Sequence, residues 1–88
     1  MHVVYHPKVK SEDIPRLVKT AILRIRKAIE DRLCLDPEQF GRPLRRGLQG
    51  YRKFRVGDYR IIYKIDHQDI KILIIGHRQD VYDKTNKR

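Results

Sequence analysis

The sequence is short of cysteine and of long hydrophobic runs, and each shortage excludes a class of protein. Its single cysteine, Cys34, excludes an internal disulfide framework and a multi-cysteine zinc site. A lone cysteine also favours a reducing compartment, so the cytoplasm is the expected location. The longest strongly apolar run is residues 72–75, far short of the roughly 18 residues that a membrane helix needs. The first ten residues lack the apolar segment of a secretory signal.

The chain is also too short for two folding units. With 88 residues it predicts a single domain spanning 1–88, since domains commonly need ~100 to 200 residues. At this size the hydrophobic core is thin. We therefore expect no elaborate buried active site.

Acidic residues are scarce relative to basic ones, and the imbalance is local. The chain has 21 lysines and arginines against 11 acidic residues, a net charge of +10. Residues 41–60 carry seven basic residues and one acidic residue, whereas residues 1–40 carry eight and six. This distribution predicts a polyanionic partner, bound by the second half of the chain.

Hydrophobic spacing predicts mostly helices in the first half of the chain. Residues 2–5 are β-prone and predict a first strand, and residues 8–14 predict a short helix. Apolar residues recur at three- and four-residue spacings over 17–33, which indicates an amphipathic helix. An Asp-Pro start signal predicts one helical turn over 37–40, followed by a basic connection over 41–50.

After residue 50 the hydrophobic period changes to two. Residues 53–56 and 59–65 predict antiparallel strands joined by a two-residue Gly-Asp turn. Residues 70–75 are almost wholly apolar, so we expect a central strand covered on both faces. Residues 77–88 form a polar tail. This order predicts an α+β fold with a helical layer on one side of an antiparallel sheet.

The predicted hairpin places basic side chains on one face of the sheet. Its two-residue turn sets Arg55 opposite Arg60. Lys53 and Lys64 stand an even number of residues from these arginines on the same strands, so the four side chains are expected on one face. Like charges in facing positions destabilise a sheet, so an anion between them is a natural explanation. Planar guanidinium groups suit phosphate, and a preorganised pair can stabilise a phosphoryl-transfer transition state. The alternative is that these are solvated positions whose long stems shield the sheet.

Other candidates lie in the connection and in the tail. Arg45 and Arg46 suit phosphate contacts, or serve only as solubility charge. His77 and Arg78 follow the apolar strand, and Tyr82 comes four residues later. Histidine can relay protons and tyrosine can stack on a base, although a surface His-Arg pair beside a core-edge tyrosine is the interpretation that these residues favour by themselves. No metal or cofactor motif is present, so any chemistry would be done by cations.

Two segments carry a resemblance to a known family. Residues 48–63, LQGYRKFRVGDYRIIY, and residues 76–82, GHRQDVY, resemble the RelE/ParE superfamily of type II toxins. The resemblance implies a helical pair on a twisted antiparallel sheet and a RelB-like antitoxin that wraps the toxin. RelE-type members cleave mRNA in the ribosomal A site without metal, by attack of the ribose 2′-hydroxyl on the adjacent phosphate.

The resemblance also implies roles for particular residues. Lys53 and Arg55 match the basic strand positions, and Arg60 would hold and stabilise the scissile phosphate. Arg78 would assist the leaving 5′-oxygen, and Tyr82 would stack on or orient the nucleotide. The implied partners are mRNA and the ribosome, with no membrane.

This sequence departs from RelE-type nucleases in two ways. Arg55 replaces a lysine, and a guanidinium is a poor general base, which leaves Lys53, His77 or no base at all. Two residues are missing between Arg78 and Tyr82. The RNA-binding residues expected outside the catalytic set are Arg45, Arg46, Lys64 and His77. The competing functions are a ParE-like inhibitor of DNA gyrase and a non-catalytic basic nucleic-acid-binding module.

Overall fold

A computed structural model describes residues 2–44, 49–85 and 88 of the chain. Short helical segments that precede α1 (η1 and η2) or continue it (η3) are given the label η. The elements in chain order are β1 His2–Tyr5, η1 Val9–Asp13, η2 Ile14–Arg16, α1 Lys19–Ala28, η3 Ile29–Leu33, α2 Pro37–Phe40, β2 Arg42–Pro43, β3 Tyr51–Val56, β4 Tyr59–Asp66, β5 Asp69–His77 and α3 Arg78–Thr85. The predicted first strand, amphipathic helix, single turn and hairpin are all confirmed, and the polar tail is largely helical.

The five strands form one mixed sheet in the order β1-β5-β4-β3-β2. Strands β2 to β5 are antiparallel neighbours, as predicted, but β1 pairs with β5 in parallel. The expectation of a wholly antiparallel sheet is corrected at this edge. A tight hairpin forces two strands to run antiparallel, whereas β1 and β5 are joined by most of the chain and are free to run in parallel.

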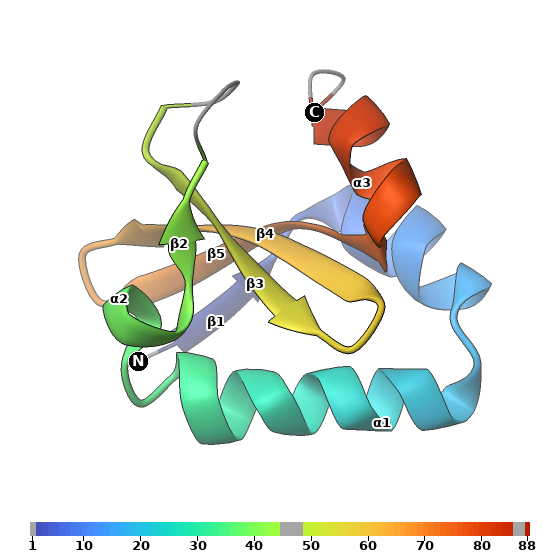
Figure 1. The fold of residues 1–88 in the computed structure, drawn as a ribbon, viewed down its shortest axis with the longest axis horizontal. Helices are drawn as coiled ribbons and strands as arrows, with labels where there is room; N and C mark the ends of the chain where they lie inside the picture. Colours follow the sequence, from blue (N-terminus) through green and yellow to red (C-terminus); the bar gives the residue numbers. More distant parts are fainter. Residues whose placement is uncertain (1, 45–48, 86–87) are drawn as a thin grey trace.

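Helices cover both faces of the sheet, α1 on one side and α3 on the other (Figure 1). The predicted helical layer on one side is corrected here, because the polar tail forms α3 and buries Val81 against the second face. The α1 side holds the larger core, in which Ile25 and Ile29 pack against Ile61 and Ile72. The α3 side holds a smaller cluster of four residues, Ile62, Leu73, Ile74 and Val81. Strand β5 therefore lies between two strands and contributes to both cores, which confirms the predicted central strand.

An irregularity between β4 and β5 allows this double coverage. The register shifts between Ile62 and Tyr63, so that Ile62 lies opposite Ile74 and Tyr63 opposite Ile72. Leu73 is skipped, and it joins Ile74 in the α3 cluster. A bulge of this kind turns two consecutive side chains to one face.

A buried ion pair attaches the end of the chain to η1. The Arg88 guanidinium donates to both carboxylate oxygens of Asp13, at 2.6 and 2.7 Å, and to the Leu73 carbonyl at 3.0 Å. Asp13 also accepts from the Ile75 N–H at 3.0 Å. Burial raises the pKa of Asp13, but these hydrogen bonds outweigh it, and the pKa lies below its ordinary value. Asp13 thus occupies the edge of β5 beyond the end of β1.

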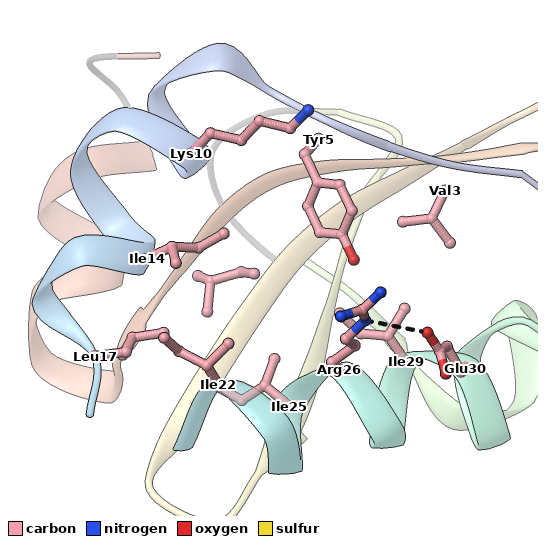
Figure 2. A pocket seen from close by; sticks show the side chains of 11 residues that line it. Val3, Tyr5, Lys10, Ile14, Leu17, Ile22, Ile25, Arg26, Ile29 and Glu30 are labelled. Atoms are coloured by element: carbon pink, nitrogen blue, oxygen red, sulfur yellow. Dashed lines mark hydrogen bonds and ion pairs between the residues drawn. The ribbon is translucent and has the colours of Figure 1, made fainter. Parts of the chain in front are cut away.

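An apolar cavity of about 360 Å³ remains between β1, η2 and α1. Figure 2 shows Tyr5, Ile14 and Ile25 among the residues that line it, with the exposed Arg26–Glu30 ion pair at its rim. Burial raises the pKa of the Tyr5 phenol, partly offset by the nearby Arg26 charge. This cavity belongs to the α1 side of the sheet.

No helix in the described part of the chain is long and apolar enough to span a membrane.

Candidate functional site

The β3–β4 hairpin has the register that its sequence predicts. Arg55 pairs with Arg60 and Phe54 with Ile61, around a turn in which Gly57 has φ 59°. Positive φ at this position is typical of the tight turns that match strand twist. Phe54 and Ile61 are buried in the α1 core, so the two arginines lie together on the opposite face.

This opposite face is hollowed into a groove of about 370 Å³. We call it the basic groove, and its lining residues are Phe40, Arg42, Lys53, Arg55 and Arg60. They come from three segments of the chain: residues 40–42, β3 and β4. The first two segments meet because β2 pairs with β3 and places Arg42 opposite Lys53. Three of the predicted catalytic residues are therefore brought together.

Among the described residues, the cations of the basic groove have no acidic partner. None of them forms an ion pair with a described carboxylate; the ion pairs within residues 2–44, 49–85 and 88 lie elsewhere. The Nε of Arg55 and the Nη1 of Arg60 instead donate to one backbone carbonyl, that of Gly57, at 3.2 and 3.3 Å. Two guanidinium groups are thus oriented by a neutral acceptor and keep their charge available for an anion.

Phe40 and Arg42 complete the groove, and neither was predicted from the sequence as a site residue. Arg42 belonged to the basic stretch of residues 41–60, which was the signal available for it. Phe40 ends the single turn α2, and nothing in its local pattern showed that the turn would lie against β3. Phe40 reaches the groove through hydrogen bonds that join α2 to β3 and β4, and such contacts between distant segments leave no signal in residue spacing.

Lys64 and His77 do not line the basic groove. Lys64 has the parity of Lys53 but lies opposite Tyr51, with its ammonium 5.8 Å from the Tyr51 ring centroid. His77 pairs with Tyr59, 6.3 Å away between ring centroids, in a separate polar pocket of about 190 Å³. Of the two residues considered as general base, Lys53 is the one in the basic groove.

The remaining predicted residues lie near the start of α3 or in undescribed parts of the chain. Arg78 is exposed, and its backbone N–H donates to the Asp58 carbonyl in the hairpin turn at 3.1 Å. Tyr82 lies one turn further along α3, and its side chain is outside the described part of the structure, as are Arg45 and Arg46. Among the described residues no group of three or more potential ligands is arranged to hold a metal ion.

Comparison with known proteins places these features in a family. Residues 3–82 match the family described as ParE toxin of the type II toxin-antitoxin system, parDE. Toxin RelE of Mycobacterium tuberculosis is 31% identical over 83 residues, covering 89% of this chain and 86% of RelE. Toxin RelG of the same organism is 44% identical over 52 residues, 57% of this chain, and the match spans only 60% of RelG.

Solved structures agree with these matches. A chain of the toxin–antitoxin complex RelBE2 from Mycobacterium tuberculosis superposes with a TM-score of 0.79 at 30% identity, covering 88% of this chain and 96% of that one. The isolated Escherichia coli RelE toxin gives a TM-score of 0.70 at 19% identity, covering 99% and 96%, a likeness of fold. The sequence resemblance is therefore confirmed: the chain belongs to the RelE/ParE superfamily of type II toxin–antitoxin toxins.

Proposed function

We propose that this toxin is a metal-independent endoribonuclease that cuts mRNA in the ribosomal A site and so inhibits translation. The observation that carries the proposal is the basic groove, in which facing Arg55 and Arg60 have no carboxylate partner among the described residues. An RNA phosphate is the natural ligand for two converging guanidinium groups. Action at the ribosome implies a cytoplasmic location.

In this proposal the groove's cations do the chemistry. The ribose 2′-oxygen attacks the adjacent phosphorus and the bond to the 5′-oxygen breaks, which leaves a cyclic phosphate and a 5′-hydroxyl. Arg55 and Arg60 stabilise the charge that develops on the phosphoryl oxygens. Lys53, in its neutral amine form, is the candidate to accept the 2′-hydroxyl proton. Arg78 stabilises the charge on the leaving 5′-oxygen, which takes its proton from water, and Tyr82 orients the nucleotide.

Primer extension on mRNA in a reconstituted translation reaction tests the proposal. Wild type is compared with Arg60→Ala, and with Arg26→Ala as a control that removes one arginine from the surface of α1. We expect cuts within codons from the wild type and the control, no cuts from Arg60→Ala, and no cuts without ribosomes. Uninterrupted translation with the wild type would contradict the proposal.

A second candidate is inhibition of DNA gyrase, and the matching family model, that of a ParE toxin, favours it. A supercoiling assay with purified gyrase separates the two candidates. Loss of supercoiling without RNA cuts would assign the gyrase function. RNA binding with neither activity would leave a non-catalytic basic module.

We also propose a cognate RelB-like antitoxin as partner. The similar chains in the RelBE2 complex and in the RelB–RelE complex of Methanococcus jannaschii are bound to antitoxins. A net charge of +10 suits an acidic partner. Growth arrest on expression, relieved by co-expression of the neighbouring antitoxin gene product, would support this pairing.

A further inference from the structure

Phe40 is an exposed aromatic side chain at the wall of the basic groove. It leaves 41% of its surface accessible and lines the groove together with Arg42 and Lys53. Phenylalanine usually contributes its large apolar area to a core. An aromatic ring beside a row of cations is instead the composition of surfaces that bind single-stranded nucleic acid, where rings stack on bases and cations follow the backbone.

The backbone that carries Phe40 is held in place by hydrogen bonds with three side chains, those of Asp36, Arg52 and Tyr63. The Asp36 carboxylate accepts from the Gln39 N–H at 3.1 Å and caps α2. Arg52 donates to the carbonyls of Glu38 and Gly41, at 2.7 and 2.8 Å, on either side of Phe40. The Tyr63 hydroxyl donates to the Pro37 carbonyl.

The approach of Tyr63 also explains the residue that follows Phe40. A Cβ atom on Gly41 would lie 1.7 Å from the Tyr63 hydroxyl, so only glycine permits this packing. The segment that presents Phe40 is thus supported from beneath by the sheet. A rigid aromatic loses little conformational entropy when a ligand binds.

Phe40 lies on the same side of the Arg42–Lys53 pair as Arg55. The strands β2 and β3 are antiparallel, so the chain runs back from Arg42 to Phe40 in the direction in which β3 runs on from Lys53 to Arg55. The ring and both paired arginines line the one groove. One short RNA segment can therefore reach the ring and the arginines together.

We propose that Phe40 stacks on a base of the RNA strand whose phosphate lies between Arg55 and Arg60, and that Arg42 contacts a neighbouring phosphate. This inference rests on the proposed nuclease function and adds a base-binding subsite to it. Stacking accepts any base, so the subsite contributes affinity and register on the strand rather than a strict sequence preference.

The chain contains no tryptophan, which makes Phe40→Trp a direct probe of the subsite. The ligand is a short 2′-O-methyl RNA, which cannot be cleaved, compared at low salt with an abasic strand of equal length and charge. We expect the fluorescence of Trp at position 40 to be quenched by the base-bearing strand and not by the abasic one. Leu35→Trp is the control, since Leu35 is 78% exposed and does not line the groove.

Binding constants of two further variants measure the contribution of the ring and of the neighbouring charge. Phe40→Ala should weaken binding of the base-bearing strand by ~5- to 150-fold, the equivalent of ~1–3 kcal/mol per stacked base, and leave the abasic strand unaffected. Arg42→Ala should weaken both strands alike and lower the slope of log K against log salt by ~1. Phe40→Tyr should restore the preference for bases.

The failure of this inference is distinguishable from that of the proposed function. If Phe40→Ala binds both strands like the wild type while Arg60→Ala loses binding, the groove binds RNA and the stacking role is wrong. If the wild type binds neither strand, the stacking subsite is overturned, whereas the proposed nuclease function stands or falls with the primer-extension result on ribosomes.

Discussion

The two faces of the β3–β4 hairpin differ in burial and in charge, although they are built from alternate residues of the same strands. The face toward α1 carries Phe54, Ile61 and Tyr63, which are at most 3% exposed. The opposite face carries Arg55 and Arg60, whose charges have no described acidic partner. The face toward α1 is therefore apolar, whereas the opposite face combines Ile62, which is buried in the α3 cluster, with two arginines that are available to a ligand.

The comparison shows how a small chain separates stability from binding. A strand alternates its side chains, so each residue added to the core brings a neighbour to the opposite surface. The hairpin uses that surface for charges that cost stability, since like charges in facing positions repel. Burial of the apolar face toward α1 has to offset this electrostatic repulsion for the fold to be stable.

Replacing Arg60 by alanine should produce the largest effect on function. We expect ribosome-dependent cleavage to fall at least ~100-fold, the scale seen when one preorganised donor to a developing charge is removed. The free energy of unfolding should change by less than ~1 kcal/mol, because Arg60 lies outside the core. Cleavage rates and thermal melting of the same preparation measure both. Full cleavage by the folded variant would refute the assignment of this face.

Replacing its neighbour Ile61 by alanine should reverse the pattern. Ile61 is fully buried, so the variant should lose ~2–5 kcal/mol of unfolding free energy, measured by urea denaturation. RNA binding per folded molecule should stay close to that of the wild type. Lys64→Ala, at another position of the groove-side face, serves as the control and should leave stability nearly unchanged. A stable Ile61 variant would contradict the division between the faces.

The buried Asp13–Arg88 pair lies outside both faces of the hairpin, and breaking it should lower the free energy of unfolding. Asp13→Asn should cost about 3 kcal/mol, because the buried Arg88 guanidinium keeps only the half-exposed Glu12 carboxylate, at 3.2 Å, as its counter-charge among the described residues. The pKa of Asp13 is lowered in the folded state, so its stabilisation is present above pH ~4 and is lost as the pH falls through the folded-state value.

Urea denaturation across an acidic pH series tests this expectation. Wild type should lose stability below pH ~4, and Asp13→Asn should lose less over the same range. Identical pH profiles for the two proteins would show that Asp13 does not carry the acid sensitivity.

The smallest effect is expected at the exposed Asp66–Lys71 pair. Hydrogen bonds from Lys71, at 2.6 Å, and from His67 hold the pKa of Asp66 at about 2. Lys71→Ala should move that pKa toward 3.8, as followed by NMR titration of the carboxyl carbon. Melting temperatures should hardly differ, because exposed ion pairs contribute little. An unmoved pKa would contradict the role of Lys71.

Local pattern was sufficient for much of this fold. The Gly57-Asp58 turn and the alternation around it predicted the pairing of Arg55 with Arg60, which the structure confirms. The Asp36-Pro37 signal predicted α2 over the residues observed. These features depend on neighbours within a few residues, where backbone geometry and hydrophobic period act directly.

Other features depended on contacts between distant segments. The parallel pairing of β1, the bulge beside Leu73 and the Asp13–Arg88 pair each join parts of the chain that no short motif connects. The placement of His77 in a pocket with Tyr59 follows from the register of β5 on β4. A sequence analysis could list His77 as a candidate but could not decide its face.

The sequence by itself determined the amphipathic helix, the single turn α2, the hairpin and the concentration of positive charge, because hydrophobic period, turn chemistry and charge are local properties. The tertiary structure alone decided which of those charges meet. It brought Phe40 and Arg42 to the arginine pair through Arg52 and Tyr63, and it placed His77 in a different pocket. The physical reason is that a groove is made by packing between segments, and packing depends on the whole chain.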